Sequence, residues 1–156
     1  MAHRQSVRAI VFKDKSLLVI KRNKFGMEYY TLLGGGIELG EAPEHALRRE
    51  LHEEATLEVG EVRPVFMEDG GDVYGVQYVY LCEYTGGEPQ MNPIAIEATL
   101  NASGQNTYTP MWLPISQMRQ VPFRSASVCD AILEAVQHGF PETPQTLAWR
   151  PESMSK

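Results

Sequence analysis

The segment Gly35–Leu57 reads GGIELGEAPEHALRRELHEEATL and contains the residues that decide the fold. Pro43 suits the first turn of a helix, because its missing N–H and fixed φ cost nothing there. We expect that helix to bury a stripe of apolar residues that recur every four positions, Leu47, Leu51 and Ala55. Gly34–Gly36 precede the helix and are predicted to form a loop at the end of a strand, because glycine allows positive φ and close backbone approach.

Three glutamates share one face of the predicted helix. At about 100° per residue, Glu53 lies about 60° to one side of Glu50 and Glu54 about 40° to the other. An exposed acidic face is common on soluble proteins, and like charges at this spacing then cost only a few tenths of a kcal/mol. Hard divalent cations such as Mg²⁺ prefer such carboxylates and retain waters and phosphate oxygens as further ligands. The spacing alone leaves both interpretations open.

The register of these residues resembles the Nudix box: Gly, five residues, Glu, seven residues, Arg-Glu, an aliphatic residue, any residue, Glu-Glu, any residue, Gly and an aliphatic residue. Eight of its nine specified positions match, namely Gly35, Glu41, Arg49, Glu50, Leu51, Glu53, Glu54 and Leu57. Thr56 stands where the family usually has glycine. Because a β-branched residue disfavours the left-handed conformation that often ends a helix, we expect a local penalty of about 1 kcal/mol or a different turn.

The resemblance implies an α/β Nudix fold, a mixed β-sheet sandwiched between helices. It also implies hydrolysis of a diphosphate linkage in a nucleoside diphosphate derivative, such as a nucleoside triphosphate, a dinucleoside polyphosphate or a nucleotide sugar. The implied cofactor is Mg²⁺, with Mn²⁺ as an alternative. A non-catalytic nucleotide sensor or interaction module is the second hypothesis, motivated by Thr56 and by the C-terminal segment.

The resemblance also assigns roles to individual residues. It implies Glu50, Glu53 and Glu54 as catalytic residues and metal ligands, with the Gly34 carbonyl as a further ligand. Glu53 is expected to deprotonate or orient the attacking water, and Glu97 is the alternative base. Arg49 and Glu41 are expected to form a structural pair that fixes the loop onto the helix.

Basic and aromatic residues outside the box are candidates for substrate binding. Arg22 ends a predicted strand, and its planar guanidinium matches phosphate geometry, although a solvated strand-end charge is an equal alternative. Arg8 alternates with apolar neighbours and is a further candidate, because alternate side chains of a strand share one face. Tyr74 matches a family marker of dinucleoside tetraphosphate hydrolases and could contact the base, although tyrosines along a strand more often pack.

The rest of the chain predicts a single domain over residues 1–139 followed by a C-terminal tail, 140–156. Strands are expected at Val7–Lys13, Leu17–Arg22, Tyr29–Leu33, Val62–Met67, Val73–Tyr84 and Tyr108–Leu113. A polar stretch, 86–107, lies between the last two. Ser125 is expected to cap a second helix that ends at Gly139, with an inward face of Val128, Ile132, Leu133 and Val136.

Charge and cysteine content limit the partners. The 156 residues contain 14 Lys and Arg against 20 Asp and Glu, a net charge of −6, and the eight glutamates from Glu38 to Glu61 against two arginines account for all of it. This balance argues against nucleic-acid binding by a basic surface. The two cysteines are expected to be buried thiols of a cytoplasmic protein, and no apolar run predicts a membrane span. We expect a small-molecule nucleotide as the substrate and a homodimer as one form of the protein.

Overall fold

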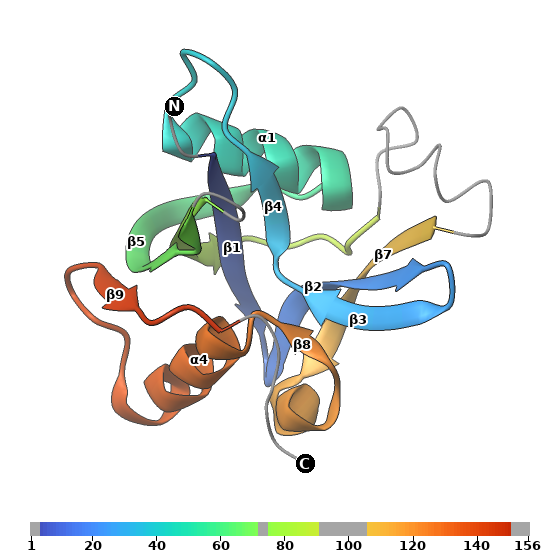
Figure 1. Cartoon of the computed structure of the whole chain (residues 1–156). Coiled ribbons are helices and arrows are strands. Elements are labelled where there is room, and N and C mark those ends of the chain that lie inside the picture. The colour runs from blue at the N-terminus through green and yellow to red at the C-terminus, as the bar shows by residue number, and fades with distance from the viewer. Residues whose placement is uncertain (1–3, 72–74, 91–105, 151–156) are drawn as a thin grey trace.

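A computed structural model describes residues 4–71, 75–90 and 106–150 (Figure 1). Within these residues, nine strands form one curled sheet, accompanied by two α-helices and a 3₁₀ helix. The strands are β1 (Gln5–Lys13), β2 (Ser16–Lys24), β3 (Met27–Thr31), β4 (Leu33–Gly36), β5 (Val59–Asp69), β6 (Val76–Tyr84), β7 (Asn106–Pro114), β8 (Phe123–Arg124) and β9 (Gln145–Leu147). The helices are α1 (Pro43–Ala55), η1 (Ile115–Gln120) and α4 (Ala126–His138).

The first strand, β1, is the centre of the sheet. It runs antiparallel to β2 and β4 and parallel to β6, and the main strand order is β8-β3-β2-β1-β6-β5-β9. β4 pairs with β1 and β7 pairs with β2 outside that order. The mixed strand directions confirm the mixed sheet predicted from the sequence.

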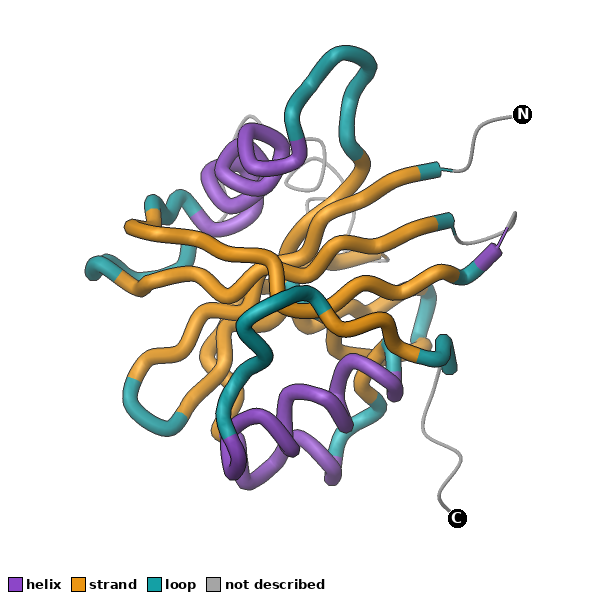
Figure 2. Tube along the Cα trace, turned by 90° about the vertical axis from the view of Figure 1, so that its left-hand side faces the viewer, coloured by secondary structure: helices purple, strands orange, loops and turns teal. Residues whose placement is uncertain are grey.

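The two α-helices cover opposite faces of the sheet (Figure 2). Alternate side chains of β1 supply both cores, as the period of two in a strand requires. Val7, Ala9 and Val11 pack in one buried cluster with the apolar stripe of α1. Ile10 belongs to a second cluster, which contains Val128 and Ile132 of α4. The layers therefore follow from two amphipathic helices and one strand buried on both faces.

Two local expectations are wrong. The glycine run is not a loop, because Gly34–Gly36 form most of β4 and pair with Ser6–Arg8 of β1. Val136 of α4 is 44% exposed, and the inward face of that helix contains Cys129 and Ala135 instead. Val128 and Ile132 are buried as predicted, so the error is confined to the solvent-side position of Val136. The predicted cap is confirmed, since Ser125 accepts a hydrogen bond from the Val128 N–H.

Part of the segment expected to be a tail belongs to the sheet. β9 pairs in parallel with Phe66–Glu68 of β5 and forms one edge of the sheet. A domain boundary between residues 139 and 140 stays a prediction. Among the residues that the model describes, none of the helices is both long and apolar enough to cross a membrane.

Candidate active site

The glycine strand brings its backbone against two carboxylates of α1. The Gly34 N–H donates a hydrogen bond to Glu54 Oε1 at 2.8 Å. A Cβ added at Gly35 would lie 2.4 Å from Glu50 Oε2, and one added at Gly34 would lie 1.9 Å from the Val7 carbonyl oxygen. At Gly34 the clash would be with the backbone of β1, so glycine is required there, whereas a side chain at Gly35 would displace the Glu50 carboxylate.

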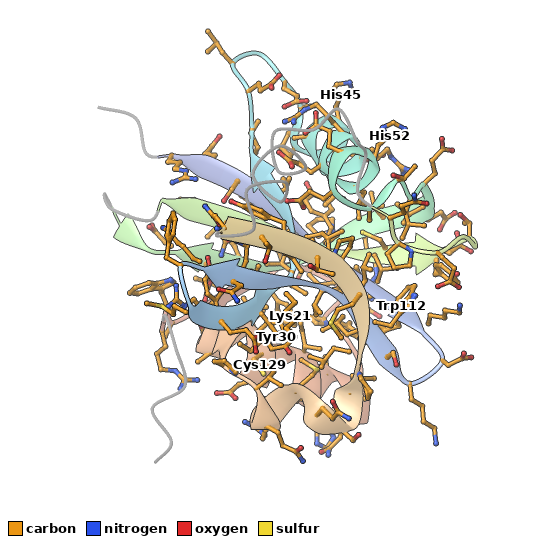
Figure 3. All side chains as sticks on the ribbon, turned by 90° about the vertical axis from the view of Figure 1, so that its right-hand side faces the viewer. Lys21, Tyr30, His45, His52, Trp112 and Cys129 are labelled. Carbon is orange, nitrogen blue, oxygen red and sulfur yellow. The ribbon has the colours of Figure 1, made fainter. Side chains whose placement is uncertain are left out.

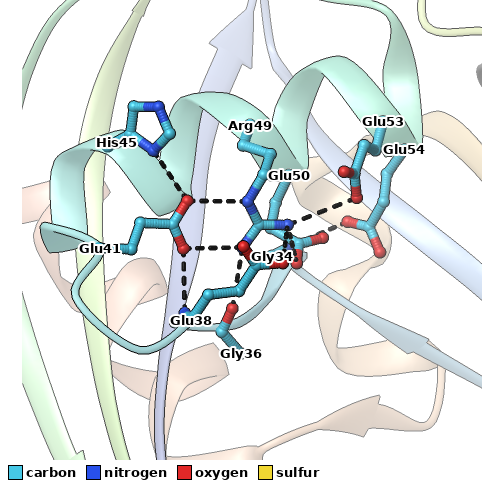
Figure 4. A network of polar contacts seen from close by, with 9 residues as sticks. All are labelled: Gly34, Gly36, Glu38, Glu41, His45, Arg49, Glu50, Glu53 and Glu54. Carbon is cyan, nitrogen blue, oxygen red and sulfur yellow. Dashed lines mark hydrogen bonds and ion pairs between the residues drawn. The ribbon is translucent and has the colours of Figure 1, made fainter.

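Arg49 and Glu41 form the predicted structural pair (Figure 4). Arg49 Nε and Nη2 donate to the two carboxylate oxygens of Glu41 at 2.8 and 3.0 Å, and Nη2 also reaches the Gly36 carbonyl at 3.0 Å. The Glu38 N–H donates to Glu41 Oε1 at 3.0 Å. The hydrogen bond from Arg49 is the main reason that the pKa of Glu41 falls from 4.5 to about 2, and the same contact raises the pKa of Arg49. This fork ties the loop before α1 to the helix.

The three glutamates of the acidic face differ in burial. Glu50 and Glu54 are 8% and 5% exposed, whereas the Glu53 side chain is 40% exposed. Arg49 Nη1 lies 3.2 Å from Glu50 Oε2 and 3.5 Å from Glu53 Oε1, so one guanidinium holds two of the three carboxylates (Figure 4). Glu50 and Glu54 therefore face the interior side of α1, and Glu53 lies at its margin.

A cavity of about 720 Å³ opens in front of Glu50 and Glu54, and Gly34–Gly36 line it as well. Its volume is in the range of small-molecule sites in proteins. Glu53 is not among the lining residues of this cavity and contributes instead to a hollow beside His45 and His52. Those two histidines lie on the outer side of α1 (Figure 3).

The donor set fits a hard divalent cation. Two buried carboxylates in a cavity wall match the few protein ligands that Mg²⁺ or Mn²⁺ takes when waters and substrate phosphates complete the shell. Among the described residues, groups of three His, Cys, Asp or Glu side chains close enough to enclose a metal are absent. The arrangement is therefore open on the cavity side, and it differs from a closed structural metal site.

Arg22 also lines this cavity. It faces Tyr29 of β3 and Tyr108 of β7 across the strand pairs, with its guanidinium carbon 3.7 Å from the centre of the Tyr108 ring. Its Nη1 donates to Tyr29 Oη at 3.1 Å, and its Nη2 donates to Asn106 Oδ1. Its buried Nε has no hydrogen-bond partner within the described part of the chain. These contacts hold the guanidinium in place at the cavity, and its role in phosphate binding stays a prediction.

Arg8 also lines the cavity and is held by a buried network. Its Nε donates to Gln77 Oε1 at 2.7 Å, and its Nη1 donates to the Leu32 carbonyl at 3.0 Å. Gln77 in turn donates to Glu68 at 3.0 Å. Burial lowers the pKa of Arg8, while the fields of Glu54 and Glu50 act in the opposite direction. Arg8 is thus a cation placed near the two buried carboxylates.

Glu68 is the buried carboxylate that ends this network, because its Oε1 accepts the hydrogen bond from Gln77. It is 1% exposed, and its second oxygen accepts hydrogen bonds from Ser125 Oγ at 2.6 Å and from Ser127 Oγ. A buried carboxylate is stable only when such donors replace water. The network connects Glu68 of β5 and the start of α4, through Gln77 of β6, to Arg8, which lines the cavity.

Thr56 occupies the left-handed position at the end of α1 with φ 54° and ψ 36°. The turn is therefore retained and not rebuilt, although threonine replaces the usual glycine. Its N–H donates to the His52 carbonyl at 3.0 Å, and its hydroxyl donates to the Gln90 carbonyl. The Gln90 N–H donates to the Ala55 carbonyl at 2.8 Å. Two hydrogen bonds to Gln90 offset part of the conformational cost.

Some expected residues cannot be assessed, and others were missed. Tyr74 and Glu97 lie outside the described residues. Four further residues that line the cavity were not among the predicted site residues, namely Tyr29, Tyr108, Arg124 and Trp149. Arg124 packs on Tyr29 with its guanidinium carbon 4.0 Å from the ring centre. Tyr29 and Tyr108 lie beside Arg22 because their strands pair with β2 on either side of it. A sequence pattern does not reveal that pairing, so no signal in the sequence pointed to these two tyrosines.

Comparison with known proteins identifies the family. The family model described as the NUDIX domain matches residues 2–128. A relative named NAD-capped RNA hydrolase NudC from Edwardsiella ictaluri is 30% identical over 76 residues, which are 49% of this chain and 30% of the relative. One of the same name from Pseudomonas putida strain KT2440 is 30% identical over 92 residues, 59% of this chain and 33% of the relative. The chain thus spans about a third of the length of these relatives.

Solved structures agree on the fold. An ADP-ribose pyrophosphatase from Streptococcus suis superposes with a TM-score of 0.66 at 21% identity, covering 92% of this chain and 99% of the other. The Nudix domain of Shewanella oneidensis NrtR, solved with ADP ribose, gives a TM-score of 0.64 at 20% identity and covers 88% of each chain. At these identities the likeness supports the fold alone.

Proposed function

The chain belongs to the Nudix family, and on that premise we propose that it hydrolyses the diphosphate linkage of a nucleoside diphosphate derivative with Mg²⁺ as its cofactor. The observation that carries the proposal is one cavity that is lined by both buried carboxylates and guanidinium groups. Buried Glu50 and Glu54 lie on one side of it, and Arg8 and Arg22 line it as well. Carboxylates suit a metal, and guanidinium groups suit phosphate oxygens.

The mechanism follows from what these residues hold in place. A bound divalent ion would neutralise phosphate charge and lower the pKa of a ligating water. Glu50 and Glu54 would hold it, with the Gly34 carbonyl as a further ligand. Arg49 fixes the orientation of Glu50 through its 3.2 Å contact.

Two further roles belong to side chains beside the metal ligands. Glu53 is the proposed group that orients or deprotonates the attacking water. It does not line the cavity, but its Oε1 lies 3.5 Å from the same Arg49 Nη1 that contacts Glu50. Arg22 is proposed to bind the phosphate that carries the developing charge, because Tyr108 and Tyr29 hold its guanidinium in place.

The substrate is proposed within the class of nucleotides that contain a diphosphate linkage to a second group. The names of the relatives include NAD-capped RNA hydrolase, and one structural neighbour holds ADP ribose. NAD and ADP ribose both contain such a linkage, so they join nucleoside triphosphates and dinucleoside polyphosphates as candidates. Because the relatives' names include RNA, a NAD-capped RNA belongs in the same panel despite the net charge of −6.

The decisive experiment incubates the protein with Mg²⁺ and this panel and identifies the products. We expect turnover of at least one compound, its loss on chelation, and its recovery on adding Mg²⁺ or Mn²⁺. Glu54→Gln and Glu50→Gln should each lower kcat by roughly a hundredfold or more, because a lost ligand weakens transition-state charge stabilisation by several kcal/mol.

Matched variants separate the site from the rest of the helix. Glu44→Gln is the control, because Glu44 is exposed on the same helix and pairs with Arg48 at 3.2 Å. Arg22→Lys should raise KM about tenfold, since lysine retains the charge but not the fork or the stacking. No turnover of any compound, or undiminished turnover by both Glu53→Gln and Glu54→Gln, would refute the proposal. Nucleotide binding without hydrolysis would instead support the sensor hypothesis.

Location and assembly are separate proposals. We propose a cytoplasmic protein that forms a homodimer, because paired strands commonly make dimers of this fold. Size-exclusion chromatography with light scattering tests the assembly, and a monomer at micromolar concentration would refute it.

A further inference from the structure

The segment after α4 is held against the domain along its length. Phe140 packs its ring 6.0 Å from the rings of Phe12 and Phe66, measured between centres. The Pro141 carbonyl accepts a hydrogen bond from Arg63 Nη1 at 2.6 Å. β9 then pairs with β5, and Leu147 packs against the core cluster on the α4 side.

The end of the described segment is fixed at the start of α4. The Ala126 N–H donates to the Arg150 carbonyl at 3.1 Å, and the Arg150 N–H donates to Ser127 Oγ at 3.1 Å. The Arg150 guanidinium also pairs with Asp130. From β9 the chain thus runs back past α4 toward β8 (Figure 1). Contacts on both sides of Trp149 leave its backbone little freedom.

Trp149 lies between these anchors and lines the same cavity as Glu50 and Glu54. Its side chain is half-buried, so part of the indole is accessible in the cavity. The residues matched by the family model end at 128, so this part of the wall comes from outside the matched segment. The C-terminal segment therefore contributes to the wall of the cavity.

We propose that Trp149 is a substrate-binding residue on which the nucleobase of the substrate stacks. This inference rests on the proposed function in so far as the ligand is a nucleoside diphosphate derivative. An indole has a large apolar face and no charge, so it suits a flat aromatic group better than a charged phosphate. The cavity is then divided by chemistry, with Glu50, Glu54, Arg8 and Arg22 for the diphosphate and Trp149 for the base.

The protein supplies its own optical test, because it contains two tryptophans. Trp112 lies elsewhere: it packs edge-on against Tyr84 at 5.3 Å between ring centres and does not line the cavity (Figure 3). Tryptophan fluorescence, excited at about 295 nm, would be titrated with ADP, GDP, CDP and UDP, with Ca²⁺ in place of Mg²⁺. Inorganic pyrophosphate is the probe without a base. The variants are Trp149→Phe, Trp149→Ala and, as the matched control, Trp112→Phe.

We expect at least one nucleoside diphosphate to quench the wild type and Trp112→Phe, and pyrophosphate to quench neither. Trp149→Phe should lose the quenching but bind the nucleotide within about threefold of the wild type by calorimetry, because a phenyl ring still stacks. Trp149→Ala should bind it about tenfold more weakly and bind pyrophosphate as the wild type does, since base stacking on an aromatic residue is worth about that factor.

The inference is overturned if Trp149→Ala binds nucleotide as tightly as the wild type, or if quenching survives in Trp149→Phe and disappears in Trp112→Phe. Equal losses for nucleotide and pyrophosphate would also overturn it, because they indicate a structural role. If Trp149→Ala does not fold, the comparison of fluorescence quenching between Trp149→Phe and Trp112→Phe tests the inference. Hydrolysis with an unchanged kcat/KM in Trp149→Ala would refute this inference alone. Quenching without hydrolysis would refute the proposed function alone.

Discussion

Substitutions at Thr56 separate two contributions to the stability of the turn after α1, the strain of the left-handed backbone and the hydrogen bond of the threonine hydroxyl. The left-handed conformation at φ 54° costs a residue with a Cβ about 1–2 kcal/mol relative to glycine. The hydrogen bond from its hydroxyl to the Gln90 carbonyl returns about 1 kcal/mol. Thr56→Ala removes the hydrogen bond and keeps the strain, so the free energy of unfolding should fall by about 1 kcal/mol. Thr56→Gly removes both the strain and the hydrogen bond. It also destabilises the native state by about 0.4–1 kcal/mol, because glycine raises the entropy of the unfolded chain. The stability of this variant should therefore remain within about 1 kcal/mol of the wild type.

Urea unfolding at 25 °C measures these differences, with equal m-values as the condition for comparing midpoints. In thermal unfolding, Thr56→Ala should melt about 2–4 °C below the wild type. Thr56→Ser is the matched control, because it keeps the hydroxyl and should stay close to the wild type. If the alanine variant were more stable than the glycine variant, the left-handed strain assigned to this position would be refuted.

Three other predictions concern the rest of the domain. Because the pKa of Glu41 is lowered to about 2 by Arg49, its stabilising effect is complete above pH 4.5 and is lost as the pH falls toward 2. The gap in Tm between wild type and Glu41→Gln should therefore be widest at neutral pH and close over that interval, and a constant gap would contradict the ion pair. Burial raises the pKa of Cys82 to about 12 and that of Cys129 to about 11. A thiol reagent at about pH 8 should therefore label both cysteines only after urea is added. Rapid labelling of the native protein would contradict their burial. Leu47→Ala should lower the free energy of unfolding by about 2–5 kcal/mol in urea, because Leu47 is fully buried under α1, and a loss below 1 kcal/mol would contradict that packing.

Local patterns were sufficient for most of the site's acidic half. The spacing of Glu50 and Glu54 and the helix start at Pro43 lie within one short segment, where residue order fixes geometry through the helical repeat. The Arg49–Glu41 pair was implied by the resemblance to the Nudix box, because Glu41 lies before the helix. The same locality explains why the cap at Ser125 was predicted correctly. Errors arose where a partner element decided the outcome, as for Gly34–Gly36, which become a strand because β1 is available to pair with them.

The sequence by itself determined that this chain has a helix with three glutamates in the register of the Nudix box, because that information is contained within one helix and its flanking loop. Only the tertiary structure decided which carboxylates are buried, because Glu54 is fixed by the Gly34 N–H of another element. It also decided that Arg22 stands between Tyr29 and Tyr108, and that the C-terminal segment brings Trp149 into the same cavity. These are contacts between residues far apart in the chain, and strand pairing and core packing set them, not residue order.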